Sequence, residues 1–593
     1  MSSRSGGGRG DSTDSEAIIS AVDTSHIDKK TDMYTVIYDP DLHLIPQDVP
    51  ASRVTFTTMS TSKLGAITPQ PPRTPRNHPQ AMASPEANFW QNATDKEMTS
   101  IEELKVMIYG TPPRGAVIIG SIFVYKIKMN PDGTIEKYKV RLATLGNHQV
   151  YGETFTETYA PGTQLPSSRI ILYLELKHMD VRTAYLQSEL TGDHDDIWVR
   201  LPAGFKSKCG SSYGRLVRPL YGVRQAGREW YFTNRNFILN QDPRWKQSTV
   251  EAQLYYAIDP KTNLFCVILV HTDDYFGICS YDTFWDKFTI DMKQRFDTNV
   301  KDSCTNMLQM SVQRQGNSFQ LHQRRQIEDI IEEFGEDMNT KNVDPPMEKG
   351  LNLPIDTVAD PKLRYRALVG ALLWIARCTR PDIMFAVIYL SRFSNFATRV
   401  HWVALTRVLR YLKTTIDVPF ILKLNNEPSS KDTSSSTITI IADSDWAGDR
   451  SDRKSFSGSC VLIDGALVNF ISSKQPTVST SSTEAEYIST SEACKEGLYF
   501  RNLLHELLPV IIPIKTLIDN IGAGCIAQNS VNNARTKHID IRYHMIRDWI
   551  FKGIFELFYI ASNKNLADIF TKALAIPAHR ELSHRLLGGH PLP

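Results

Sequence analysis

The order of apolar and polar residues predicts regular structure only beyond about the first hundred residues. Helical spacing begins at Asn88, and apolar, strand-like runs follow at 116–128. Upstream, residues 1–14 are rich in Ser and Gly, and residues 61–85 contain six prolines, which suit neither a helix interior nor a central strand. We therefore expect residues 1–87 to form a disordered tail or linker.

A β-hairpin with two adjacent carboxylates is predicted near the middle of the chain. An apolar run at 264–270 is followed by His271, Thr272, Asp273 and Asp274, and then by a returning strand-like run. Asp is common in turns for structural reasons. The hairpin alone therefore leaves both a structural and a catalytic role open.

A third carboxylate lies in a segment that is otherwise apolar or β-branched. Asp180 stands between Met179 and Val181, where an unpaired charge is costly to bury. Its partner is either an arginine, such as Arg182 or a more distant one, in a salt bridge, or a divalent cation shared with the hairpin. Mg²⁺ prefers oxygen ligands, and two such ions about 4 Å apart can clamp the attacking and leaving oxygens of a phosphoryl transfer.

Three cations are predicted on one face of another strand. Residues 130–133 (Asn-Pro-Asp-Gly) form a turn signal, and Lys137, Lys139 and Arg141 alternate along the returning strand. The surrounding segment, 126–141, holds five basic and two acidic residues. From the pattern alone, such a face is usually simply solvated.

The last third of the chain contains a second series of carboxylates, two of them at the ends of predicted strands. An alternating strand at 437–442 leads to Asp443, and a short apolar strand leads to Asp519. A helix is predicted over 562–574, with Asp568 early in it. For that residue alone, a favourable interaction with the helix dipole is the structural alternative.

Two glutamates lie in a long helix predicted over 481–507. Glu484 fits a capping box with Ser481, which gives it a structural role on a mostly polar face. Glu486 instead shares the packed face with small residues such as Gly497. A buried carboxylate there needs a partner, so Glu486 is the functional candidate.

Several segments resemble a single family, in the order in which that family has them. They are YKVRLATLGNHQVYGETFTETYAP (138–161), MDVRTAYL, LVRPLYGVRQAGREWY (216–231), TDD, YRALVGALLWIARCTRPDIMFAVIYLSRF (365–393), ADSDWAGDRSDRKSFSG, SKQPTVSTSSTEAEY and RTKHIDIRYHMIRDWI. They extend over most of residues 90–593. The chain thus resembles the reverse transcriptase and ribonuclease H portion of copia-type LTR retrotransposon Pol polyproteins.

The resemblance implies a multidomain fold of the α+β and α/β classes. A right-hand polymerase with fingers, palm and thumb would be followed by a connection segment and a ribonuclease H-like, mixed-sheet domain. We expect the reverse transcriptase over 88–345, and the thumb and connection segment with a polar linker over 346–436. The ribonuclease H-like domain would cover 437–593.

The resemblance also implies roles for individual residues. The expected catalytic and metal-binding residues are Asp180, Asp273, Asp274, Asp443, Glu486, Asp519 and Asp568. The expected substrate- and nucleic-acid-binding residues are Lys139, Arg141, Gln225 and His538. Asp180 and Asp273 would be the main metal ligands of the palm, because neighbouring strand residues point to opposite faces. The implied cofactor is Mg²⁺, with Mn²⁺ as the alternative.

The family also implies partners and a location. An RNA template, an RNA–DNA hybrid and dNTPs would be the substrates, and capsid and integrase proteins would share a virus-like particle with the chain. We expect the particle to be cytoplasmic, with the nucleus as the alternative, and we expect no membrane association. The longest uninterrupted apolar run, 367–376, is indeed too short to span a bilayer.

Composition limits this picture without changing it. Lys and Arg number 67 and Asp and Glu 65, a net charge of +2, which excludes a uniformly basic coat but not a local basic channel. The eight cysteines form no CxxC pair or His/Cys cluster, which argues against a disulfide scaffold and a structural zinc site. Motifs of a protease, an integrase or a zinc knuckle are not recognisable.

Some departures from the family pattern bear on activity. The hairpin reads HTDD where the family usually has YVDD, and Gly277 weakens the returning strand. The segment between Arg169 and Asp180 is also several residues shorter than usual, which could displace Asp180. Two alternatives therefore stand beside the active enzyme: an inactive remnant that at most binds nucleic acid, and a protein that retains only ribonuclease H activity.

Overall fold

The computed structural model describes two short strands, β1 (Met33–Tyr34) and β2 (Val49–Pro50), and most of residues 72–589. Within 72–589 the segments left out are 130–133, 174–175, 191–195, 204, 206, 208, 260, 263, 281, 302, 336–341, 356–357, 424–436, 509–512 and 529–539. The chain divides into two compact units, Met1–Thr74 and Pro75–Pro593. In the first unit, β1 and β2 pair in antiparallel fashion.

The start of the second unit differs from the expected tail. Residues 78–82 form a short helix, α2 (His78–Met82), inside the segment for which we expected disorder. Its proline, Pro79, lies in the first turn, where a missing N–H costs nothing. Asn77 caps the helix by accepting a hydrogen bond from Gln80 N. Most of the remaining expected tail lies outside the described residues.

A five-stranded sheet follows, in the region expected to form the fingers. Its order is β3-β8-β7-β4-β5. The elements are α3 (Ala87–Glu103), β3 (Met107–Tyr109), β4 (Ile118–Met129), β5 (Ile135–Thr144), η4 (Gly146–His148), β7 (Trp198–Arg200) and β8 (Tyr213–Leu216). Helix α3 packs on β5, where Trp90 is buried against Tyr125 and Tyr138. One face of the β4–β5 ribbon is thus covered, and the face carrying the alternating cations stays open.

The expected palm is a six-stranded sheet in the order β13-β6-β12-β11-β10-β9. Its elements are α4 (Leu165–Ile170), η5 (Ile171–Tyr173), β6 (Lys177–Val181), η6 (Ala184–Gln187), α5 (Ala226–Gln241), β9 (Trp245–Gln247), β10 (Leu254–Ile258), β11 (Phe265–His271), β12 (Asp274–Cys279), α6 (Asp282–Arg295) and β13 (Thr298–Lys301). Strands β11 and β12 form the predicted hairpin. A disulfide joins Cys266 and Cys279 across it, which the cysteine spacing had not suggested.

The thumb and connection region combines a small antiparallel sheet, β14-β15-β16-β17, with four helices. Its elements are β14 (Asn306–Met307), β15 (Met310–Gln315), β16 (Ser318–His322), α7 (Arg324–Phe334), α8 (Tyr365–Cys378), η7 (Pro381–Ile383), α9 (Met384–Ser391), α10 (Arg399–Thr414) and β17 (Phe420–Lys423). The expected linker at 424–436 lies outside the described residues.

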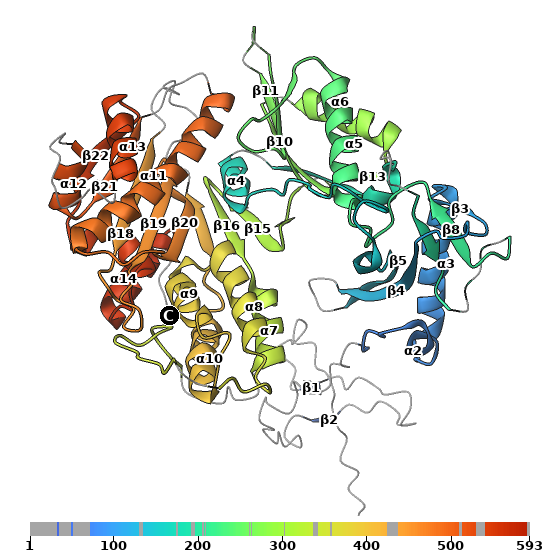
Figure 1. The fold of residues 1–593 in the computed structure, drawn as a ribbon, viewed down its shortest axis with the longest axis horizontal. Coiled ribbons are helices and arrows are strands. Elements are labelled where there is room, and N and C mark those ends of the chain that lie inside the picture. The colour runs from blue at the N-terminus through green and yellow to red at the C-terminus, as the bar shows by residue number, and fades with distance from the viewer. Residues whose placement is uncertain are drawn as a thin grey trace, which may run out of the picture. The chain divides into compact units, whose positions relative to one another are not determined.

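The last domain is built on a mixed sheet in the order β20-β19-β18-β21-β22 (Figure 1). Its elements are β18 (Ile438–Ser444), β19 (Phe456–Ile463), β20 (Ala466–Lys474), α11 (Ser482–Leu507), β21 (Ile514–Ile518), α12 (Ile521–Gln528), α13 (Asp540–Phe551), β22 (Phe555–Tyr559), η10 (Ser562–Lys564), η11 (Leu566–Phe570) and α14 (Ile576–Leu586). The first three strands are antiparallel, and β21 and β22 join in parallel. This is the ribonuclease H-like, mixed α/β arrangement expected from the sequence, so the predicted fold class is confirmed.

Helix α11 confirms one expectation and corrects another. Gly497 faces the sheet, where an added Cβ would approach Ile440 to 2.2 Å, so the predicted packed face is the real one. Glu484, however, is also buried, and its carboxylate accepts hydrogen bonds from Thr480 N and Oγ1. The first half of α11 is therefore covered on the face that we had expected to be polar.

The expected helix over 562–574 is absent from this described segment, which instead forms η10 and η11. Asn565 interrupts the helical path because its side chain accepts from Ala567 N and donates to Ala442 O on β18. These bonds anchor the turn to the sheet. Asp568 therefore lies in a short 3₁₀ turn held against the strand that carries Asp443, rather than early in an α-helix.

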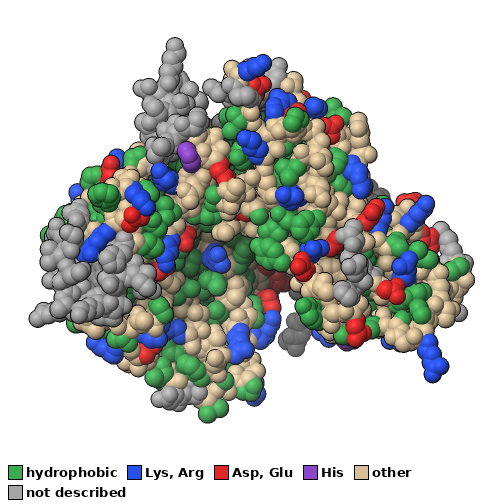
Figure 2. Space-filling model, turned by 45° about the horizontal axis from the view of Figure 1, so that its top comes forward, with side chains coloured by type: hydrophobic (Ala, Val, Ile, Leu, Met, Phe, Trp, Pro, Cys, Tyr) green, Lys and Arg blue, Asp and Glu red, His purple; other side chains and the backbone are tan. Residues whose placement is uncertain are grey.

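Charge and hydropathy of the described surface agree with the composition. On the face in Figure 2, Lys and Arg side chains are interspersed with acidic, polar and apolar ones and form no continuous basic coat. Among the described residues, no helix is both long enough and apolar enough to cross a membrane.

Candidate active sites

The palm brings its three predicted carboxylates together at one end of the sheet. Strands β6 and β12 pair so that Asp180 is the direct cross-strand partner of Asp274, and Asp273 precedes it in the turn. The shortened segment before Asp180 still accommodates a helix and a strand, because α4 and η5 end only four residues before β6. Asp180 thus lies beside the hairpin carboxylates in this structure, and an effect of the shorter segment on activity stays a prediction.

The turn that presents Asp273 is fixed from both sides. Thr272 has a left-handed conformation (φ 58°), which is unfavourable for a β-branched residue. Trp230 Nε1 donates to the Thr272 carbonyl at 2.5 Å, and Val181 N donates to the Asp273 carbonyl at 2.7 Å. The HTDD sequence thus forms a well-anchored turn despite its departure from the family pattern.

Burial and neighbouring charge both act on Asp273. Burial raises its pKa, and the nearby carboxylates of Asp274 and Asp180 raise it further. Carboxylates packed in this way repel one another unless protons or cations compensate them. The palm end therefore has the chemistry of a divalent cation site.

His178 is a site residue that the sequence reading missed. It lies on β6, its ring is 3% exposed and stacks on Phe276 at 5.0 Å, and its Nε2 donates to Asp274 Oδ1 at 2.9 Å. A signal existed in the sequence, because residues two apart on a strand share a face and Asp180 is two residues further on. His178 orients one carboxylate of the set.

A cleft of about 1030 Å³ joins these carboxylates to the basic strand of the fingers. Its lining includes Asp180, Asp273, Asp274, Lys126, Lys128, Lys137, Lys139, Arg141 and, from α8, Trp374. Burial lowers the pKa of Lys139 to about 8, and repulsion from Arg141, Lys128 and Lys137 adds to the effect. Arg141 lies 4.6 Å from the centre of the Tyr221 ring. Two of the predicted cations thus face the predicted carboxylates across one cleft.

Gln225 does not belong to this cleft lining. Its side chain is 3% exposed, donates to the Thr154 carbonyl at 3.0 Å and accepts from Gln149 Nε2 at 3.1 Å. In this structure it therefore holds a loop of the fingers in place, and the expected contact with template or nucleotide finds no support. The second predicted binding residue, His538, lies outside the described residues.

The C-terminal sheet brings a second set of carboxylates together. Asp443 comes from β18, Glu486 from α11 and Asp519 directly follows β21, and ligand atoms of the three lie within 4.8 Å of one another. Burial raises the pKa of Asp443 to about 6 and that of Glu486 to about 9. Repulsion from the Asp443 carboxylate raises the pKa of Glu486 further. Without a cation, this site favours protonated carboxyl groups.

The fourth carboxylate approaches Asp443 from the other side. Asp568 is brought there by η11, and Gly458, the cross-strand partner of Asp443, leaves room for it. A Cβ on Gly458 would lie 2.8 Å from the Ala567 carbonyl. Lys572 Nζ lies 3.0 Å from Asp568 Oδ1 and 3.7 Å from Asp443 Oδ2. The sequence reading had not included this lysine.

The four residues fit a divalent cation. Glu486 Oε2 is buried without a hydrogen-bond partner, which is costly for a carboxyl oxygen unless a ligand satisfies it. The atoms that these four residues offer to a metal ion are carboxylate oxygens, the ligand type that hard cations such as Mg²⁺ prefer. Among the described residues, Asp443, Glu486 and Asp519 are the group whose ligand atoms lie close enough together to hold a metal ion. The palm carboxylates are a second candidate because they line one cleft.

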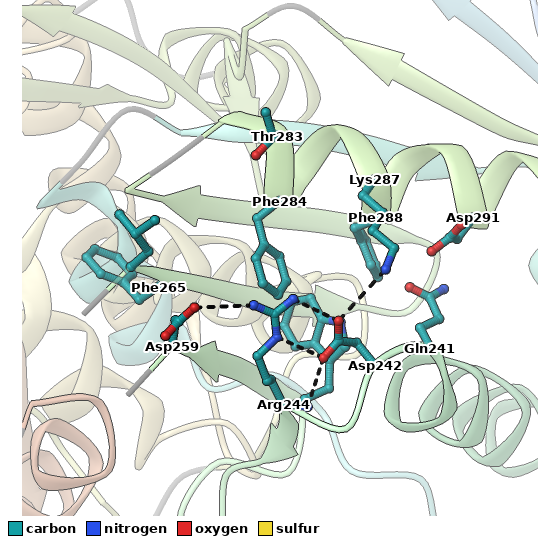
Figure 3. Close-up of a pocket in the computed structure, with 12 residues that line it drawn as sticks. Gln241, Asp242, Arg244, Asp259, Phe265, Thr283, Phe284, Lys287, Phe288 and Asp291 are labelled. Carbon is teal, nitrogen blue, oxygen red and sulfur yellow. Dashed lines mark hydrogen bonds and ion pairs between the residues drawn. The ribbon is translucent and has the colours of Figure 1, made fainter. Parts of the chain in front are cut away.

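A smaller cavity, of about 260 Å³, lies in another part of the palm (Figure 3). There Arg244 contacts Asp242 at 2.8 Å and Asp259 at 3.7 Å, and Lys287 lies 3.8 Å from Asp242. The hydrogen bonds from Arg244 lower the pKa of Asp242 to about 2. Since both cations drawn there have carboxylate partners within the cavity, it is a poor phosphate site.

Comparisons with known proteins identify the family of the chain. Residues 106–349 match the reverse transcriptase (RNA-dependent DNA polymerase) family. The chain is 32% identical over 525 residues to a retrovirus-related Pol polyprotein from transposon RE2 of Arabidopsis thaliana, covering 86% of this chain and 34% of that polyprotein. It is 30% identical over 537 residues to the Pol polyprotein from transposon TNT 1-94 of Nicotiana tabacum, covering 87% and 39% respectively.

A solved structure of a foamy viral protease-reverse transcriptase in complex with double-stranded DNA is a more distant match. Its TM-score is 0.45 at 10% identity, covering 79% of this chain and 69% of that one. Residues 106–349 are thus a reverse transcriptase domain by family. The chain as a whole belongs to the Pol polyproteins of copia-type retrotransposons, and it spans about a third of the length of these curated relatives.

Proposed function

We propose that the chain is an RNA-directed DNA polymerase joined to a ribonuclease H of a copia-type retrotransposon. The observation that carries the proposal is the cleft in which Asp180, Asp273 and Asp274 face Lys139 and Arg141. Carboxylates at one end and cations at the other suit a substrate that is both metal-bound and polyanionic. A dNTP beside a primer terminus meets that description.

In the polymerase, Asp180, Asp273 and Asp274 would hold Mg²⁺, or Mn²⁺ as the alternative. When bound, the ions supply Lewis-acid stabilisation of the oxygens that exchange during nucleotidyl transfer. Lys139 and Arg141 would bind the triphosphate, and His178 would keep Asp274 oriented by its hydrogen bond. The anchored turn would hold Asp273 in place while the substrate binds.

In the ribonuclease H, Asp443, Glu486, Asp519 and Asp568 would hold the ions next to the RNA strand of a hybrid. Affinity for nucleic acid should come mainly from phosphate contacts and so fall with salt. Hybrid and DNA duplex would be distinguished by groove shape and 2′-hydroxyl groups. We propose capsid and integrase proteins as further partners, in a cytoplasmic virus-like particle or in the nucleus.

Two substitutions separate the two activities. In Mg²⁺-dependent assays of the purified chain, Asp273→Asn should abolish primer extension and leave hybrid cleavage, and Asp443→Asn should do the opposite. Asp286→Asn, at an exposed position of α6, is the matched control and should change neither. If both activities are absent, the chain is an inactive remnant; if only cleavage occurs, it retains ribonuclease H alone.

A further inference from the structure

Asp443 has carboxylate neighbours of two kinds, one group without an ammonium ion pair and one residue that is paired with the ammonium of Lys572. On one side, Glu486 and Asp519 complete a cluster whose ligand atoms lie within 4.8 Å of one another. On the other side lies Asp568, and there the ammonium of Lys572 contacts both carboxylates, at 3.0 Å from Asp568 and 3.7 Å from Asp443. The ammonium of Lys572 thus already pairs with the Asp568 and Asp443 carboxylates, whereas it acts on Glu486 and Asp519 without forming an ion pair with either.

The position of Lys572 is set by its neighbour. Thr571 is fully buried, and its hydroxyl donates to Asp443 Oδ2. This bond fixes the backbone next to Lys572, so the ammonium reaches the carboxylates on a tethered but flexible four-carbon stem. The Lys572 side chain is 44% exposed, whereas that of Asp443 is 3% exposed. The ammonium can therefore move toward solvent, and the carboxylate that it compensates cannot.

A simple surface ion pair is the structural alternative. Asp568 and Lys572 are four residues apart, the usual spacing of such pairs on helices. That reading does not explain the second contact, because Asp443 lies on the central strand of the sheet and is separated from Lys572 by more than a hundred residues. The Lys572 ammonium therefore also interacts with Asp443, the carboxylate that the metal cluster contains.

We propose that Lys572 occupies the cation position between Asp443 and Asp568 and must be displaced before a divalent cation binds there. This inference rests on the proposed function in that it takes Asp443 as a metal ligand. A first ion enters the cluster formed with Glu486 and Asp519, where Lys572 competes less, because the ammonium acts on the charges of these two residues but forms its ion pairs with Asp568 and Asp443. A second ion enters only when the ammonium swings out, so Lys572 is a positioning residue that makes the two binding steps unequal.

Binding of Mn²⁺ to the full-length chain without nucleic acid tests the proposal. The measurement uses a background with Asp273→Asn and Asp274→Asn, so that the C-terminal carboxylates dominate the signal. Free Mn²⁺ followed by electron paramagnetic resonance should show one tighter and one weaker ion. Adding Lys572→Met, which keeps the stem and removes the ammonium, should tighten the weaker ion about tenfold, equal to about 1.4 kcal/mol.

Two further variants control the result. Lys495→Met removes an ammonium that pairs with Glu492 on an exposed part of α11 and should leave Mn²⁺ binding unchanged. Lys572→Arg keeps the charge and should leave the second ion weak, even if Lys572→Met proves too unstable to study. An unchanged or weaker second ion in Lys572→Met, or a tighter one in Lys572→Arg, would overturn the proposal.

The outcome is independent of catalysis. A wild-type chain that binds two unequal ions but cleaves no hybrid would reject the proposed ribonuclease activity and leave the role of Lys572 intact. A chain that cleaves hybrid but binds Mn²⁺ equally well with and without the Lys572 ammonium would support the ribonuclease activity and reject the role of Lys572.

Discussion

The imidazole of His178 donates a hydrogen bond to the carboxylate of Asp274 across two antiparallel palm strands, at 2.9 Å. The His178 ring is 3% exposed, whereas the Asp274 side chain is 35% exposed and opens to the cleft. One of the three palm carboxylates is therefore oriented by a buried imidazole.

Removing that donor should weaken the polymerase selectively. We expect His178→Ala to lower kcat/KM for primer extension about tenfold, since a lost hydrogen bond to a charged group costs about 1.5 kcal/mol. His178→Gln, which can still donate, should retain most of the activity. Hybrid cleavage serves as the internal control, and an equal loss of both activities would point to misfolding rather than to orientation of Asp274.

The protonation of Lys139 should appear in the pH dependence of nucleotide binding. Its pKa is about 8, below the usual value, because burial and the neighbouring cations disfavour its charge. The cation is present below that pH and is lost above it, so the KM for dNTP should rise as the pH passes through about 8. Lys139→Arg should remove this rise, because an arginine stays protonated.

The C-terminal carboxylates should make stability depend on pH when no metal is present. The pKa of Glu486, raised to about 9 by burial and by Asp443 and Asp519, lies above its unfolded value near 4.5. Between these values the folded state binds more protons than the unfolded state, so stability falls as the pH rises, by at most about 1.4 kcal/mol per pH unit for one group.

Thermal unfolding in EDTA from pH 5 to 9 measures this effect. Glu486→Gln should flatten the decline, and Mg²⁺ should raise the unfolding temperature most at the alkaline end. A wild-type curve in EDTA that rises over this interval would contradict the assignment of Glu486 as a buried, proton-binding carboxylate.

The palm strand that seemed weakened by a glycine depends on it. Gly277 lies on β12, and a Cβ there would approach the Trp285 ring to 2.2 Å. We expect Gly277→Ala to destabilise the protein by about 1–3 kcal/mol through overpacking. In Gly370→Ala, on α8, nothing lies within 4 Å of the added Cβ, so chemical denaturation should show a small gain from the better helix propensity.

The sequence predicted the elements that carry the carboxylates more reliably than the contacts between them. The strand pattern marked Asp443 and Asp519 at the ends of predicted strands. It placed Asp180 within an apolar segment and Asp273 in a hairpin turn, and the family resemblance then assigned the catalytic roles. Glu486 followed from helical periodicity in the same way. Each of these residues was found from a short stretch of sequence, and the expected fold class then indicated which of them would lie together.

Contacts that depend on tertiary structure were not predictable from local patterns. Gln225 was assigned to the substrate by motif, whereas its neighbours in space, Gln149 and Thr154, turn it into a buried anchor. The spacing of Asp568 and Lys572 was visible, but not that a 3₁₀ turn pinned by Asn565 would bring both to Asp443. Such contacts join parts of the chain that no short window contains.

The reverse transcriptase domain with its connection region and the ribonuclease H-like domain share one apolar core, which includes Ile170, Leu372, Phe420, Val468 and Leu587. At its centre, the fully buried Arg169 donates to the carbonyls of Arg377 and Cys378 on one side and of Val468 on the other. Separating the two parts would expose this core and leave the Arg169 guanidinium without its Val468 acceptor. A substitution that unfolds one half should therefore also destabilise the other.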